Sequence, residues 1–343
     1  MDYKDLNLIG SSSPHIRTKA GTGHIMGEVL LAMLPALGFA IYNFGWRALA
    51  NVVVSALGCC IFEWLYRAMM KKNNTVMDLS AAVTGVLIAF VSPVTIPYWI
   101  LLIGDFFAIV IVKQLFGGIG KNFLNPALAA RAFMFSWAGE MSKWAVPSVR
   151  TDSLTPLWGA VDVVTGPTPM SFLAENNLAE LSEYYSVSDM FIGLIGGSLG
   201  EVSALMLLIG GLYLVFRKII TWCIPVGYIG TVALLTFLFP RGNDPMTWML
   251  YNVLGGGLML GAFFMATDYV TSPVSRKGQL IFGIGCGLIT VFIRYFGSYN
   301  EGVCYAILVM NLTVWMIDRK VKPARFGVVK APKEKKEKEG EKK

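Results

Sequence analysis

The chain has 343 residues, of which 29 are Lys or Arg and 22 are Asp or Glu, giving a formal net charge of +7. Residues 319–343 hold 11 basic and 4 acidic side chains, so this segment carries the whole excess and leaves 18 of each sign elsewhere. Because residues 1–318 are neutral overall, the chain is not expected to bind nucleic acid. It is 55% hydrophobic and 15% charged, whereas an ordinary soluble domain has about 25% charged residues, so a soluble domain is excluded as well.

Ten apolar segments are predicted to be transmembrane helices, because a helix needs roughly 20 mainly apolar residues to cross a bilayer core. They are residues 27–43, 48–69, 79–91, 98–116, 127–138, 190–216, 223–239, 248–267, 280–296 and 303–317. The third and fifth are short and rich in Gly and Ala, so we expect them to be buried among other helices or broken. The predicted fold class is an all-α integral membrane protein.

Basic residues cluster within and at the edges of alternate connections between these helices. With ten helices every cluster lies on one side, which the positive-inside rule makes cytoplasmic. The N-terminal segment 1–26 and the basic tail 319–343 are therefore predicted to be cytoplasmic. No cleavable signal peptide is visible in segment 1–26, and the composition of the tail predicts disorder. The long connection 139–189 is predicted to be extracytoplasmic. The clusters are Arg17 with Lys19, Arg67 with Lys71 and Lys72, Lys113 with Lys121, Arg217 with Lys218, and Arg276 with Lys277.

A weak internal repeat divides the chain into two halves, residues 27–138 and 190–318. Because each half has five predicted helices, an odd number, the halves would insert with opposite orientations, as in many transporters. Coincidence of common membrane residues is the alternative explanation. The matching pairs are Ser92-Pro93-Val94 with Ser272-Pro273-Val274, Phe116-Gly117 with Phe296-Gly297, and Gly27-Glu28-Val29 with Gly200-Glu201-Val202.

The cysteines and histidines do not predict a metal site. All five cysteines lie inside predicted membrane helices and form no C-x-x-C pair, and both histidines lie in the polar N-terminal segment. No Ser/His/Asp arrangement or phosphate-binding P-loop is present, so the chain is not expected to be a hydrolase on its own.

Carboxylates within or near the membrane helices are candidates for an ion pathway. Asp105 lies in the middle of a predicted helix, where a charge costs on the order of 3 kcal/mol or more. It is expected either to face an ion or cofactor pathway or to hydrogen-bond to a neighbouring helix. Glu28, Glu201 and Asp268 are the other candidates, although Glu28 and Glu201 would also interact favourably with a helix N-terminus.

The extracytoplasmic connection contains the most specific motif, Asp162-Val163-Val164-Thr165-Gly166-Pro167-Thr168. It resembles a flavin-attachment motif, D-x-x-[ST]-G-A-T. Residues 116–127 (FGGIGKNFLNPA) and 130–133 (ARAF) extend the likeness. The chain resembles, over residues 20–320, the family of the D subunit of the Rnf electron-transport complex and the B subunit of the sodium-translocating NADH:quinone oxidoreductase, and its length favours the Rnf type.

This resemblance implies a cofactor, FMN, joined to Thr168 through a phosphoester by a separate flavin transferase. Asp162, Thr165 and Gly166 would support the motif, and Thr165 is the alternative acceptor. Pro167 departs from the family pattern, which has Ala there, and together with Pro169 it restricts the backbone around Thr168 to an extended form. The resemblance also allows a second, non-covalent flavin such as riboflavin between the halves.

The resemblance further implies a function and a location. The chain would be a subunit, inactive alone, of a complex in the cytoplasmic membrane that moves Na+ or H+ while electrons pass between ferredoxin and NAD+. Other subunits and lipid would be its partners, and its fold would be similar to that of urea channels. A stand-alone inverted-repeat transporter or channel is the alternative, and a scaffold without cofactor would require the loop motif to be accidental.

Overall fold

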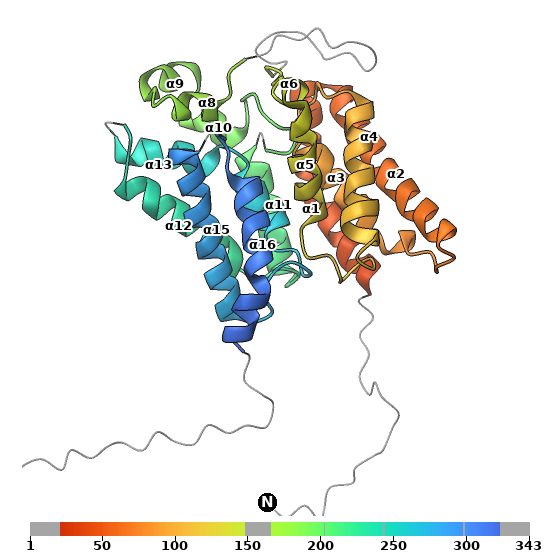
Figure 1. Cartoon of the computed structure of the whole chain (residues 1–343). Coiled ribbons are helices and arrows are strands. Elements are labelled where there is room, and N and C mark those ends of the chain that lie inside the picture. The colour runs from red at the N-terminus through yellow and green to blue at the C-terminus, as the bar shows by residue number, and fades with distance from the viewer. Residues whose placement is uncertain (1–20, 148–165, 202, 243, 298, 323–343) are drawn as a thin grey trace, which may run out of the picture.

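The computed structural model describes residues 21–147, 166–201, 203–242, 244–297 and 299–322, and the regular elements within these ranges are all helical (Figure 1). Within the described ranges, three helices are long and apolar enough to cross a membrane: α1 (Thr22–Phe44), α2 (Trp46–Met69) and α15 (Arg276–Phe296). The predicted class, an all-α membrane protein, is confirmed. The N-terminal segment up to residue 20 and the tail from residue 323 lie outside the described residues.

The first half is built from α1, α2 and three further helical units. The helix α2 packs against both α3 and α4, and α5 packs against both of them. Close approach of α2 and α3 depends on Gly85, since a Cβ there would lie 2.5 Å from the carbonyl oxygen of Ser55. The further units are α3 (Ser80–Phe90), α4 (Tyr98–Phe106) continued by the π-helix η3 (Phe107–Gln114), and α5 (Pro126–Met134).

The second half presents helices in a corresponding order. The helix α12 packs against α13 and α15, and α15 packs against α16. The two Ser-Pro-Val motifs occupy corresponding places, one shortly after α3 and one after η5. The further helices of this half are α11 (Ala204–Phe216), α12 (Cys223–Leu238), α13 (Pro245–Leu254), α14 (Leu258–Leu260) with the π-helix η5 (Gly261–Met265), and α16 (Val303–Lys320).

The first helices of the two halves, α1 and α11, pack antiparallel along their length. Near the start of α1, Glu28 accepts a hydrogen bond from Arg217 at the end of α11. Near the end of α1, the Asn43 amide donates to the Gly193 carbonyl, 2.7 Å away, in the segment that leads to α11. An antiparallel pair is what an inverted repeat requires of these two helices.

Two predicted helices are interrupted. The segment predicted as one helix over 190–216 forms α10 (Val187–Ile192), then an irregular stretch, then α11. The backbone N–H groups of Leu199 and Gly200 in that stretch donate to the carbonyls of Ser92 and Phe90, so contacts with the first half replace helical bonds. The predicted helix 248–267 bends by 59° between α13 and α14.

Short helices lie at the end of the molecule opposite to the start of α1 and the end of α16 (Figure 1). They occupy parts of the connection 139–189, for which the sequence predicts no membrane helix. Local capping explains two of them, because the Asn177 side chain caps α9 and Ser186 with Asp189 forms a capping box on α10. These helices are α6 (Ala138–Met141), α8 (Pro169–Ala174), α9 (Leu178–Tyr184) and α10.

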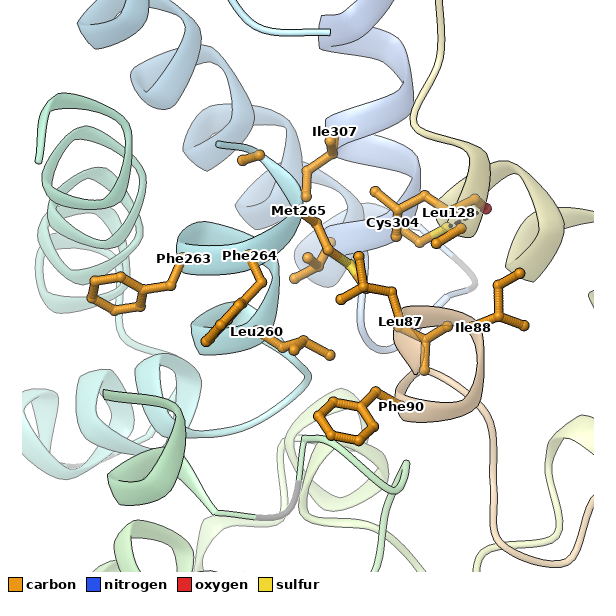
Figure 2. Close-up of a cluster of buried hydrophobic side chains, with 14 of the residues drawn as sticks. Leu87, Ile88, Phe90, Leu128, Leu260, Phe263, Phe264, Met265, Cys304 and Ile307 are labelled. Atoms are coloured by element: carbon orange, nitrogen blue, oxygen red, sulfur yellow. Dashed lines mark hydrogen bonds between the residues drawn. The ribbon is translucent and has the colours of Figure 1, made fainter. Parts of the chain in front are cut away.

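A buried apolar cluster fills the centre, where the halves meet. Figure 2 shows side chains converging from α3, α5, η5 and α16, with the Cys304 thiol 3.4 Å from the Leu128 carbonyl oxygen. Along α5, Ala127 lines one pocket, Leu128 belongs to the cluster, and Arg131 lines a second pocket. The cluster therefore separates two pockets, described below as the Asp268 pocket and the Thr168 pocket.

Candidate functional site

Thr168 begins the short helix α8. Its φ and ψ of −80° and 156° are extended, and its carbonyl accepts from the Ser171 backbone N–H at 3.0 Å. The next residue, Pro169, is buried at the first helical position, where its missing N–H is harmless. The Thr168 side chain makes no capping hydrogen bond, so the fold does not use its hydroxyl to start the helix.

The backbone before Thr168 is hydrogen-bonded to neighbouring segments of the chain. The Gly166 N–H donates to the Trp144 carbonyl at 3.2 Å, and the Tyr185 hydroxyl donates to the Pro167 carbonyl at 3.3 Å. Two predicted members of the motif, Asp162 and Thr165, lie outside the described residues. Three consecutive motif residues, 166–168, are thus held against neighbouring segments.

Thr168 lies at a pocket of about 260 Å³ that both halves line. One wall is aromatic, and it includes Tyr299, whose ring centroid is 4.8 Å from that of Tyr305 and 6.1 Å from that of Phe135. Trp144 adds a fourth aromatic ring to the lining. Such a wall suits a flat aromatic ligand, because rings gain stability from stacked and edge-on contacts beyond their area burial.

A charged group that we term the Arg131 cluster, consisting of Arg131, Glu201 and Glu301, adjoins this pocket. One terminal nitrogen of Arg131 is 2.7 Å from the Glu201 carboxylate, and the other contacts that of Glu301. Arg131 and Glu201 are 3% and 8% exposed, whereas Glu301 is 23% exposed. Arg131 comes from the first half and both carboxylates from the second, so the cluster joins the halves beside Thr168.

The composition of the Thr168 pocket fits a flavin. A hydroxyl is available for a phosphoester, four aromatic side chains suit the flat ring system, and the Arg131 cluster supplies polar groups for its edge. Sequence reasoning named Thr168 as the flavin acceptor and Glu201 as an ion-pathway candidate, and it did not single out Arg131 or Glu301. Arg131 lies in the segment 130–133 that resembles the family pattern, whereas no sequence signal indicates Glu301.

Glu28 lies at the other end of the molecule, on α1. Its carboxylate accepts from Arg217 at 2.5 Å and from the Tyr213 hydroxyl, and His24 is 3.6 Å away. Both repeat-related glutamates, Glu28 and Glu201, therefore pair with an arginine of the opposite half. They lie at different ends and do not contact each other.

Asp105 is fully buried between α2 and α4. One carboxylate oxygen accepts from the Ser55 hydroxyl at 2.6 Å and from the Cys59 thiol at 3.5 Å, and the other has no hydrogen-bond partner among the described residues. The contact with Ser55 is of the kind that the structural alternative predicts, and a role in an ion pathway stays a prediction.

Asp268 follows η5 and lines the Asp268 pocket, a cavity of about 100 Å³ between the halves. Its carboxylate accepts from the Thr271 hydroxyl at 3.2 Å. The same pocket includes Lys113, whose ammonium group is buried 2.8 Å from both the Glu63 carboxylate and the Ser80 hydroxyl. The four carboxylates proposed for an ion pathway thus occupy separate places, and Lys113 with Glu63 forms a buried pair that sequence reasoning did not identify.

Together, the apolar helices, the broken helix and the aromatic pocket with a free hydroxyl define a multi-helix membrane protein with a candidate site for a flat ligand. The model of the NQR2, RnfD, RnfE family matches residues 9–327. The chain belongs to this family, and the resemblance inferred from residues 116–127 and 162–168 is confirmed.

Individual relatives match along almost their whole length. The chain is 49% identical over 333 residues to the D subunit of the Na(+)-translocating ferredoxin:NAD(+) oxidoreductase complex of Acetobacterium woodii, with 96% of this chain and 98% of that protein covered. It is 40% identical over 324 residues to the D subunit of the proton-translocating ferredoxin:NAD(+) oxidoreductase complex of Clostridium ljungdahlii, covering 92% and 95%. A third relative, the D subunit of the ion-translocating oxidoreductase complex of Stutzerimonas stutzeri, is 38% identical over 335 residues, covering 90% and 93%.

Proposed function

We propose that this chain is the membrane subunit of an ion-translocating ferredoxin:NAD+ oxidoreductase complex and that it carries FMN on Thr168. Family membership supports the role in a complex. The observation that supports the cofactor is the Thr168 hydroxyl, unused as a helix cap, at a pocket with an aromatic wall and the Arg131 cluster. The membrane would be the cytoplasmic membrane, with Thr168 outside and both termini inside.

The residues around Thr168 would perform three tasks. The turn at Pro169 holds the Thr168 backbone extended, and the aromatic wall offers a surface on which a flat ring can pack. The Arg131 cluster supplies hydrogen-bonding and charged groups in a partly buried setting, where their electrostatic effect is stronger than in water. When bound, FMN supplies electron-transfer chemistry that no side chain has.

The proposed attachment can be tested by mass spectrometry. Chymotrypsin should release residues 159–172, since it cleaves after Trp158 and after Phe172, and this peptide contains both Thr165 and Thr168. Protein purified from native membranes with its partners should yield this peptide fluorescent and heavier by FMN less one water. Fragmentation should assign the added mass to Thr168, and an unmodified peptide would contradict the proposal.

Two matched variants separate the candidate acceptors. We expect Thr168→Val to abolish the covalent flavin and Thr165→Val to retain it. The reverse result would move the attachment to Thr165. A colourless, solitary protein with uptake activity would instead favour a transporter without a redox role.

We further propose that the Asp268 pocket receives a second, non-covalent flavin such as riboflavin. Its lining combines the rings of Phe263 and Phe264 with the Asn125 amide and the Ser80 hydroxyl, which suits an apolar ring system with a polar edge. The cavity of about 100 Å³ would have to widen to admit this ligand. Denaturing the protein should release this flavin into solution. The variant Thr84→Phe, which fills the pocket, should reduce the released flavin and leave the Thr168 flavin unchanged.

A further inference from the structure

Glu301 lies in the connection between α15 and α16, outside both helices, and its side chain lines the same pocket as Thr168. With 23% of its side chain exposed, the carboxylate is accessible from the pocket and also contacts the buried Arg131. It belongs to none of the repeat or attachment motifs. Its placement therefore calls for an explanation of its own.

Glu301 depends on Arg131 for charge compensation. A second arginine, Arg294, is close, but it donates its Nε to the Glu301 backbone carbonyl at 3.0 Å. The other guanidinium nitrogens of Arg294 donate to backbone carbonyls at the break between α13 and α14. The titratable groups that face Glu301 from α5, α15, α16 and the segments before α11 and α16 are Arg131, Arg294, Cys304, Tyr305, Glu201 and Tyr299.

We propose that Glu301 is a positioning residue that, through Arg131, sets the reduction potential of the flavin on Thr168, an inference that rests on the proposed function. Reduction adds negative charge to the ring system, which a nearby positive charge favours. The negative charge of Glu301 offsets the positive charge of Arg131 and so lowers the reduction potential of the flavin. Removing the carboxylate leaves Arg131 paired with Glu201 alone and makes reduction easier.

Proton binding to Glu301 gives the same effect a pH dependence. Burial raises the pKa of the Glu301 carboxyl to about 7, although Arg131 opposes this shift. Above this pH the carboxylate is charged and lowers the reduction potential of the flavin. Below it the carboxyl group is neutral, like the amide of Glu301→Gln. The potentials of the wild type and of Glu301→Gln should therefore differ at pH 8 and converge at pH 6.

The test is a spectroelectrochemical titration of the full-length chain produced with a flavin transferase. At pH 8 we expect Glu301→Gln to raise the equilibrium constant for reduction by about tenfold, equal to about 30 mV for a two-electron couple. The control is Glu140→Gln, because Glu140 forms an exposed ion pair with Lys143, 2.7 Å away, at the same end of the molecule. The control should leave the potential unchanged.

The variant Glu301→Asp distinguishes the effect of the carboxylate charge on the reduction potential from the effect of altered packing. Because it keeps the carboxylate, its potential should stay near that of the wild type at both pH values. Equal shifts in Glu301→Asp and Glu301→Gln, or no shift in Glu301→Gln, would overturn the inference while leaving the proposed function intact. A wild-type chain without flavin on Thr168 would overturn both.

Discussion

Asp105 shows how one buried carboxylate can support two explanations. Its bonded oxygen accepts from Ser55 and Cys59, as a structural carboxylate would, but its second oxygen is buried and finds no hydrogen-bond partner in the part of the chain that the structure describes. A buried polar atom of this kind needs a reason, such as a water, an ion or a functional role. The residue is therefore a good position for an experiment that distinguishes structure from transport.

We predict that Asp105→Asn impairs ion translocation more than electron transfer. Asn keeps the size and the acceptor for the Ser55 hydroxyl, so folding should be preserved while the charge is lost. Both rates can be measured on the complex reconstituted in vesicles. Equal loss of both rates in a fully assembled complex would indicate a structural role.

The buried pair of Lys113 and Glu63 leads to a stability prediction. Lys113→Met leaves the Glu63 carboxylate with the more distant Arg67, 3.8 Å away, as its remaining cation and should destabilise the protein by up to about 3–5 kcal/mol. The midpoint of thermal unfolding in detergent measures this loss. The double variant with Glu63→Gln should recover part of it, and an unchanged midpoint in Lys113→Met would contradict the prediction.

Sequence reasoning predicted the family correctly because the motif that indicates it lies in consecutive residues. The run around Thr168 identified a family, but the Arg131 cluster is assembled from α5, from the segment before α11 and from the connection before α16. Nothing local to Glu301 indicates that it will contact a residue 170 positions away. Such contacts depend on how the two halves meet.

At the scale of elements, the contact between α1 and α11 depends on a single small residue. A Cβ at Gly210 of α11 would lie 2.1 Å from the carbonyl oxygen of Ala32. Small residues allow helix backbones to approach closely in membranes, where the hydrophobic effect does not drive helices together. The two halves therefore meet through backbone contact at this point.

We predict that Gly210→Ala lowers the thermal unfolding midpoint, since overpacking costs about 1–3 kcal/mol. The matched control is Gly230→Ala in α12, where a Cβ would meet nothing within 4 Å. Ala favours helix by about 1 kcal/mol over Gly, so the control should be neutral or stabilising. Similar destabilisation by both substitutions would show that α11 has no special constraint.

The positions of the helices were predicted better than their interruptions. Apolar length located α1, α2, α15 and α16 within a few residues. It missed the irregular stretch before α11, although Gly193, Gly196, Gly197 and Gly200 were a visible signal. Tertiary bonds from Leu199 and Gly200 to the first half stabilise that stretch, and an apolarity pattern carries no information about them.

At the scale of the whole molecule, the start of α1 and the end of α16 lie at one end, and α8, whose N-cap is Thr168, lies at the opposite end (Figure 1). The inverted relation of the halves and the orientation in the membrane remain predictions. Both concern the assembly of the chain in a bilayer rather than any single helix.

We predict that a membrane-impermeant maleimide labels Ser142→Cys in intact cells and labels Lys320→Cys only after lysis. Both positions are exposed, one at the Thr168 pocket and one at the end of α16. Replacing Cys60, the one cysteine that is not buried, by Ala gives a suitable background. Labelling of Lys320→Cys alone in intact cells would reverse the orientation.

The break between α13 and α14 has a consequence for how cations could move through this protein. In many transporters, carbonyls freed by a broken helix coordinate the transported cation. Here the guanidinium of Arg294 binds the carbonyls of Asn252, Gly255 and Gly256. The protein thus carries a covalently attached cation at the place where a mobile cation binds in such transporters.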